Sequence, residues 1–268
     1  VAKSNSTVTI YVSDLSEDAA PGSNADLELV ATQYHPEAEA WQESLSTLKV
    51  GRNEIHIPRI GSSNQEAGGA LYLRYTGDRG AEQYQVRVVS GANDAAKSIT
   101  KIPVLRLDGV AGGERTAAIE AYVSELQSYV RGLNDLHYST HGGIDYHYDE
   151  KECFLNSTEI TMENMMFSLP ATQVWAAISG DSTADKLEQA VAAMEQEIDY
   201  FYQFKGLNRA ATDNDAYPST RLNIRYHQVP SGQSMYADDK HIGMEYDRVP
   251  ELFQATPVTA EANGKKTG

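Results

Sequence analysis

The sequence has one cysteine, no long apolar run and few basic residues. Cys153 alone cannot form a disulfide within the chain, a composition found in cytosolic proteins and in many secreted bacterial ones. No stretch approaches the roughly 18 apolar residues that cross a bilayer. Asp and Glu number 38 against 22 Lys and Arg, so the formal net charge is −16. Because such an acidic surface repels phosphate, we expect no nucleic-acid binding and no docking to an anionic membrane.

The common catalytic signatures are also missing. His-Glu-x-x-His places two zinc-binding imidazoles and a general base on one face of a helix, and it does not occur in the 268 residues. A Gly-rich phosphate loop and a Gly-x-Ser-x-Gly elbow are absent as well. Motifs alone therefore assign no catalytic residue and no metal ligand to this chain.

The first hundred residues carry the period-two pattern of β-strands. Apolar and polar residues alternate over residues 7–13, 27–33, 53–58, 70–76 and 84–89. Turn-forming residues separate these stretches, for example at 21–24, 61–64 and 76–80. Short strands at this spacing are typical of a β-sandwich or jelly roll, which we predict as an all-β sandwich-like subdomain over residues 1–110.

From about residue 110 the pattern changes to a helical period. Apolar residues recur at steps of three and four from Ile119 to Leu133 and again from Leu187 to Phe201, with Ser182 or Thr183 as the N-cap of the second helix. Strands are predicted over 158–168, 221–227 and 241–246, with a short helix after Pro170. The fold class is therefore predicted as α+β, with a mixed α/β subdomain over residues 111–268.

Three groups of residues could bind a ligand, and each has a simpler interpretation. Residues 213–217 offer oxygen ligands for calcium but lack the usual glycine and distal glutamate, so we favour a turn. The 16 tyrosines and Trp41 could stack on sugars, although most lie at core positions. The third group has residue types that zinc accepts, but its spacing matches no compact ligand pattern, so we favour a polar loop and a buried Cys153. Its members are His137, His141, Asp145, His147, Asp149, Glu150 and Cys153.

Several segments resemble the enhancin-like, mucin-degrading zinc metallopeptidases of peptidase family M60. They occur in the family's order from about residue 6 to the end of the chain. In the β-rich half they are residues 31–35 with Trp41, 51–58 and 68–77. In the second half they are residues 102–105, 156–160, 165–174, 193–196, 221–227, 235–237 and 241–246.

The resemblance implies a secreted, gluzincin-like zinc peptidase that cuts O-glycosylated, mucin-type proteins. It implies that His-Glu-x-x-His lies beyond Gly268, so we expect the chain to be a piece of a longer polypeptide, inactive alone and without catalytic residues or metal ligands. It further implies that an edge strand at 234–237 or 241–246 pairs with substrate, with Tyr236 and His241 as candidates to face it. Two alternatives stay open: a non-catalytic carbohydrate- or protein-binding module over residues 1–110, and a small metal-binding enzyme built on residues 137–153.

Overall fold

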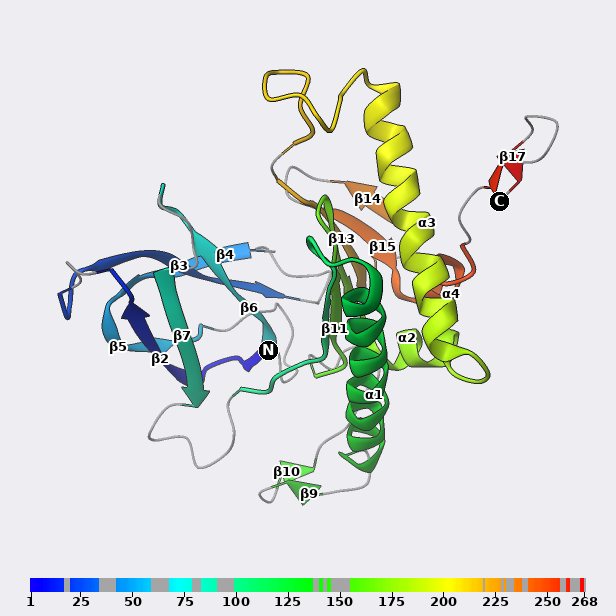
Figure 1. The fold of residues 1–268 in the computed structure, drawn as a ribbon. Coiled ribbons are helices and arrows are strands. Elements are labelled where there is room, and N and C mark those ends of the chain that lie inside the picture. The colour runs from blue at the N-terminus through cyan, green and yellow to red at the C-terminus, as the bar shows by residue number, and fades with distance from the viewer. Residues whose placement is uncertain are drawn as a thin grey trace. The chain divides into compact units, whose positions relative to one another are not determined.

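The chain forms two compact units. The computed structural model describes residues 1–16, 20–33, 42–58, 68–78, 83–90, 99–136, 140–141, 144–145, 155–218, 220–227, 229, 234–237, 241–255, 259–260 and 266–267. The first unit comprises Val1–Lys101 with Thr140–Asp145 and Glu152–Leu155, and the second comprises Ile102–Ser139, Tyr146–Lys151 and Asn156–Gly268. Every α-helix that the structure describes belongs to the second unit (Figure 1). The predicted α+β class is confirmed, whereas the jelly-roll arrangement and the subdomain bounds stay predictions.

The first unit consists of antiparallel strands. One sheet has the order β1-β6-β3-β4 and the other the order β5-β2-β7, and all five predicted strands lie in them. The strand β4 was not predicted, because only Leu45 and Leu48 are apolar in it. The bounds are β1 Ala2–Lys3, β2 Thr7–Asp14, β3 Asn24–Gln33, β4 Gln42–Lys49, β5 Gly51–His56, β6 Gly68–Tyr75 and β7 Tyr84–Ser90, with a separate pair of β9 Thr140–His141 and β10 Ile144–Asp145.

The core of the first unit is almost purely apolar. In β2 the buried Val8, Ile10 and Val12 alternate with the exposed Tyr11 and Ser13, as the period-two pattern requires. They join one apolar cluster with Leu27, Leu29 and Ala31 of β3, Leu48 of β4 and Ile55 of β5, so residues from both sheets share a single core. Burial of this surface is the main favourable contribution to folding.

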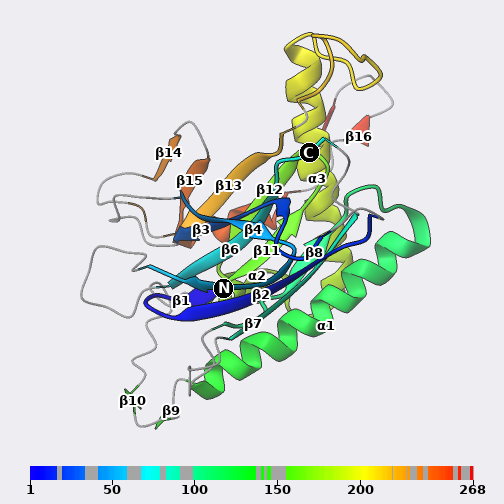
Figure 2. The same cartoon turned by 90° about the vertical axis from the view of Figure 1, so that its left-hand side faces the viewer.

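The second unit is built on a six-stranded mixed sheet with the order β14-β15-β13-β12-β11-β8 (Figure 2). Its strands are β8 Val104–Arg106, β11 Thr158–Thr161, β12 Met165–Leu169, β13 Leu222–His227, β14 Met235–Ala237 and β15 Ile242–Glu245. Neighbours are parallel except for the antiparallel pairs β11/β12 and β14/β15. The structure therefore corrects the single strand predicted over 158–168 to a hairpin, whose turn lies at residues 162–164.

Helices cover one face of this sheet (Figure 1). They are α1 Gly112–Leu136, α2 Ala171–Ile178, α3 Thr183–Phe204 and the short α4 Val249–Leu252, which follows a 3-10 turn at Tyr246–Arg248; β16 Thr259–Ala260 and β17 Lys266–Thr267 form a separate pair. The predicted stripe of α1 is confirmed from Ile119 to Leu133. In α3 the stripe ends early, because Phe201 is 52% exposed and Tyr202 is buried instead.

The start of α3 agrees with the prediction in position but has no side-chain cap. Ser182 occupies the N-cap position, but its backbone is left-handed with φ 58° and its side chain makes no capping hydrogen bond. The hydroxyl of Thr183 donates to the carbonyl of Gly180 at 2.9 Å instead. Packing of the buried helix face, rather than a side-chain cap, therefore stabilises this helix.

Candidate functional site

The strand β14 forms one outer edge of the six-stranded sheet. Its neighbour is β15, with Met235 opposite Met244, Tyr236 opposite Gly243 and Ala237 opposite Ile242. The side chain of Met235 is 56% exposed. An edge strand can add a further strand through its outer backbone groups, which makes β14 a geometric candidate for pairing with an extended peptide.

The sheet has one apolar face and one polar face. Ile160, Phe167 and Ile224 share a register across β11, β12 and β13. Tyr226 points to the same side as Ile224, where burial, then Glu251 of α4 and Glu197 of α3, raise its pKa to about 12. Side chains alternate along a strand, so these residues mark the face that the helices cover.

The opposite face carries a row of polar residues. The pairing register aligns Glu159, Ser168, Arg225, Gly243 and Tyr236 across β11, β12, β13, β15 and β14. The first three of these are buried, and the hydroxyl of Ser168 donates to a carboxylate oxygen of Glu159 at 3.5 Å. Burying charged groups costs free energy unless they are paired. Apolar packing alone therefore does not explain this buried polar row, which makes the face a candidate for binding or catalysis.

At the edge of this face a tyrosine hydroxyl bridges two histidines. The Tyr236 hydroxyl lies 2.9 Å from Nε2 of His227, at the end of β13, and 2.9 Å from Nε2 of His241, just before β15. Both imidazoles are buried, at 3% and 4% exposure. Both rings stand edge-on to the tyrosine, with centroids 5.6 and 5.5 Å from its centroid. We call His227, Tyr236 and His241 the edge cluster.

Gly243 makes room for the tyrosine of the edge cluster. A Cβ atom at residue 243 would lie 2.1 Å from Cε1 of Tyr236, so the aromatic ring lies directly against the glycine on the neighbouring strand. The lack of a side chain at this position is therefore a condition for the observed place of Tyr236.

The sequence prediction named two of the three members of the edge cluster. Tyr236 and His241 are brought together as neighbours, and their contact with a substrate stays a prediction. His227 was placed on a strand but not in a site. Its relation to Tyr236 depends on the parallel pairing of β13 with β15, a non-local contact that no spacing along the sequence reveals.

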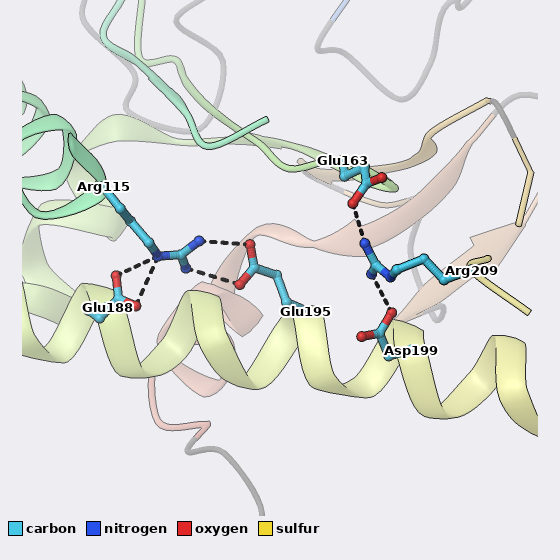
Figure 3. A network of polar contacts seen from close by, with 6 residues as sticks. All are labelled: Arg115, Glu163, Glu188, Glu195, Asp199 and Arg209. Carbon is cyan, nitrogen blue, oxygen red and sulfur yellow. Dashed lines mark hydrogen bonds and ion pairs between the residues drawn. The ribbon is translucent and has the colours of Figure 1, made fainter. Parts of the chain in front are cut away.

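Figure 3 shows a network of charged contacts in the second unit. Its residues other than Glu188 line a cavity of about 400 Å³. Nε of Arg115 donates to both carboxylate oxygens of Glu188 at 3.0 Å. Nη1 and Nη2 of the same arginine donate to the two carboxylate oxygens of Glu195, also at 3.0 Å. Arg209 joins Asp199, at 2.6 Å, to Glu163. Burial lowers the pKa of Arg115, but its hydrogen bonds to the carboxylates of Glu195 and Glu188 outweigh burial and raise the pKa.

These ion pairs tie elements of the second unit together. Arg115 at the start of α1 is joined to α3, and Arg209 joins α3 to Glu163 in the turn of the β11/β12 hairpin. The described residues that line the cavity include three carboxylates, those of Glu163, Glu195 and Asp199, and each is ion-paired with Arg115 or Arg209 rather than free to act as a general base. The network is best explained as a structural link between the helices and the sheet.

Most of the residues weighed as a candidate metal cluster lie outside the described residues. His137, His147, Asp149, Glu150 and Cys153 are not described, nor is Trp41, while His141 and Asp145 lie in the paired strands β9 and β10. Within the described ranges, three or more His, Cys, Asp or Glu residues nowhere come together in a way that could hold a metal ion.

The candidate calcium segment forms a turn. Its backbone N–H groups at Asp215 and Ala216 donate to the side chain and the carbonyl of Asp213, at 3.1 and 3.0 Å. Tyr217 packs edge-on against Tyr202, with ring centroids 4.8 Å apart. In the part of the chain that the structure describes, none of the helices has the length and apolar character of a membrane span.

Comparison with solved structures identifies the fold. The M60 catalytic domain of ZmpC from Clostridium perfringens, solved in complex with the sialyl T antigen, has a TM-score of 0.65 and 17% identity over 94% of this chain. ZmpB metallopeptidase from the same organism has a TM-score of 0.65 and 18% identity, also over 94% of this chain. A metallopeptidase from Bacteroides thetaiotaomicron has a TM-score of 0.51 and 13% identity over 94% of this chain.

This chain spans less than half of each of these structures, 43% for the two clostridial ones and 34% for the third. No protein-family model matches the sequence, and no curated protein matches it. The likeness is thus one of structure at low identity, and it concerns a part of the M60 domain. The chain has the fold of the M60 metallopeptidase catalytic domains over almost its whole length.

Proposed function

We propose that this chain is the front part of a secreted zinc metalloendopeptidase that hydrolyses peptide bonds in O-glycosylated, mucin-type proteins. The observation that supports this proposal best is the M60 fold, which matches over 94% of this chain and covers 43% of the ZmpC structure. The missing His-Glu-x-x-His then has a simple explanation, because the zinc ligands would lie in the part of the domain that this chain does not include.

The residues present contribute one wall of the cleft. Zinc, when bound, would polarise the scissile carbonyl and lower the pKa of a bound water. The edge strand β14 would pair its outer backbone groups with the substrate backbone, in antiparallel or parallel orientation, and so hold the peptide extended. The strand itself is positioned by β15 and by the edge cluster. The first unit would help to place the glycosylated part of the substrate.

The glycan part of the proposal is supported by a relative. The ZmpC structure contains the sialyl T antigen, which is a glycan bound by a domain of this fold. A sugar-bearing substrate fits an enzyme that acts outside the cell, so we propose an extracellular location for the parent protein.

The test compares matched peptides. The longer protein that contains this chain is incubated with one peptide in two forms, with and without an O-linked sialyl T antigen, and the products are read by mass spectrometry. We expect cleavage of the glycosylated form only, loss of cleavage with a chelator, and recovery with zinc. Equal cleavage of both forms would refute the glycan requirement, and no cleavage by the zinc-loaded protein would refute the peptidase function. We expect residues 1–268 alone to cleave neither form.

A further inference from the structure

We propose that Tyr236 is a positioning residue, which fixes the edge strand β14 so that its outer backbone groups stay aligned for an incoming peptide. The part of this inference that concerns a peptide rests on the proposed function. The part that concerns the strand rests on the geometry of the edge cluster alone.

The strand β14 is short for an edge strand that is to bind a peptide. It has three residues and pairs with β15 at three positions. A strand of this length forms few ladder hydrogen bonds, and edge strands are held from one side only. Additional contacts are therefore needed if the strand is to keep one position when a peptide binds to it.

The tyrosine hydroxyl supplies two such contacts. One leads to His227 on β13, which is the next strand beyond β15, and the other to His241 before β15. Because both imidazoles are buried, each hydrogen bond forms away from competing water, and its loss would leave a buried polar group without that partner. The hydroxyl thus ties β14 across two strands rather than one.

The hydroxyl also has a defined direction. It carries one proton, so it donates to one imidazole and accepts from the Nε2–H of the other. Neutral imidazoles satisfy this arrangement only when they adopt opposite tautomers. Together with the ring held against Gly243, these contacts set the position of the Tyr236 side chain from three sides.

The first experiment measures amide hydrogen exchange in this chain with Tyr236→Phe. The variant keeps the ring against Gly243 and removes both hydrogen bonds. We expect roughly tenfold to hundredfold faster exchange at residues 235–237 and 242–245, since two hydrogen bonds are lost and each contributes up to about a factor of ten. Tyr122→Phe is the matched control, because it removes another buried tyrosine hydroxyl of the same unit, 2.8 Å from Thr158. Equal exchange in the two variants at these residues would overturn the inference.

Substitutions at His241 give a second measurement. Glutamine can place a hydrogen-bonding amide near the position of Nε2, whereas leucine cannot. We expect His241→Gln to keep most of the protection of β14 and His241→Leu to lose it as Tyr236→Phe does. Similar loss of protection in both would show that the imidazole acts by packing, which contradicts the inference.

The substrate role is tested in the longer zinc-containing protein. With the glycosylated peptide, Tyr236→Phe is expected to raise KM about fivefold and to leave kcat nearly unchanged, because the strand binds ground state and transition state alike. A KM equal to that of Tyr122→Phe would refute the substrate role. If the wild-type protein lacks peptidase activity, the proposed function and the substrate role both fail, and the exchange rates still decide whether Tyr236 fixes the strand.

Discussion

The two units bury different kinds of side chains. Among the described residues of the first unit, every buried polar side chain is a hydroxyl, namely Ser4, Ser6, Thr9 and Thr32. The second unit buries amides, a carboxylate, a guanidinium and imidazoles: Asn156, Asn164, Glu159, Arg225, His227 and His241. A hydroxyl is readily satisfied by a nearby carbonyl, as Ser6 is by that of Lys3 at 2.5 Å. Buried charged and amide groups need specific partners, so the second unit is where we expect chemistry and binding.

The largest effect is expected in the apolar core of the first unit. Leu48 is fully buried in β4, so Leu48→Ala should lower the free energy of unfolding by about 2–5 kcal/mol through lost apolar burial and a cavity. Leu15→Ala is the control, because Leu15 is 59% exposed, and it should change the value by about 0.5 kcal/mol or less. Urea denaturation of both variants measures this, and equal losses would show that this core does not stabilise the unit.

Two asparagines compare polar contacts in the two units. Asn156 is buried, accepts from the backbone N–H of Thr172 at 2.9 Å and donates to Thr172 Oγ1 at 3.0 Å. Asn53 in β5 is only half-buried. Its side chain accepts from the backbone N–H of Lys49 and donates to the carbonyl of the same residue, both at 2.8 Å. We expect losses of about 2–3 kcal/mol for Asn156→Ala and about 1 kcal/mol for Asn53→Ala. Thermal unfolding measures both, and the reverse order would break the contrast between the units.

Two glycines test the packing at the edge of the sheet. Gly243→Ala places a methyl group against Tyr236 and should cost about 1–3 kcal/mol by overpacking. At Gly113, near the start of α1, an added Cβ would meet nothing within 4 Å, so Gly113→Ala should be neutral or slightly stabilising. Urea denaturation compares the two. If Gly243→Ala proves as harmless as its control, Tyr236 does not lie against the glycine.

The smallest effect concerns an exposed contact of the first unit. Hydrogen bonds from Ser44 and then Arg74 lower the pKa of Glu28 below 4.5. A lowered folded-state pKa gives stability that is present above the unfolded pKa and is lost as the pH falls through the folded pKa. Glu28→Gln should therefore cost stability near neutral pH and cost less as the pH falls below 4.5. Unfolding midpoints between pH 7 and pH 3 measure this, and Arg74→Gln should give a weaker trend in the same direction.

Local patterns predicted the strands and helices but not the site. The alternation in β2 and the stripe of α1 are properties of neighbouring residues, so the sequence alone predicts them. The strand β4 was missed because most of its residues are polar. The hairpin at 158–169 was read as one strand, although the step from Met162 to Met165 interrupts the alternation. The polar row joins strands that are distant in sequence, and the edge cluster depends on the parallel pairing of β13 with β15; a single sequence specifies neither pairing.

The most direct test of the proposed peptidase function is the coding sequence for about fifty codons beyond Gly268. The proposal predicts a His-Glu-x-x-His motif there, followed by a further glutamate as a third zinc ligand, which would complete the M60 domain that this chain begins. A stop codon, or a helix without those residues, would contradict it. The chain would then have the fold of these peptidases without their chemistry.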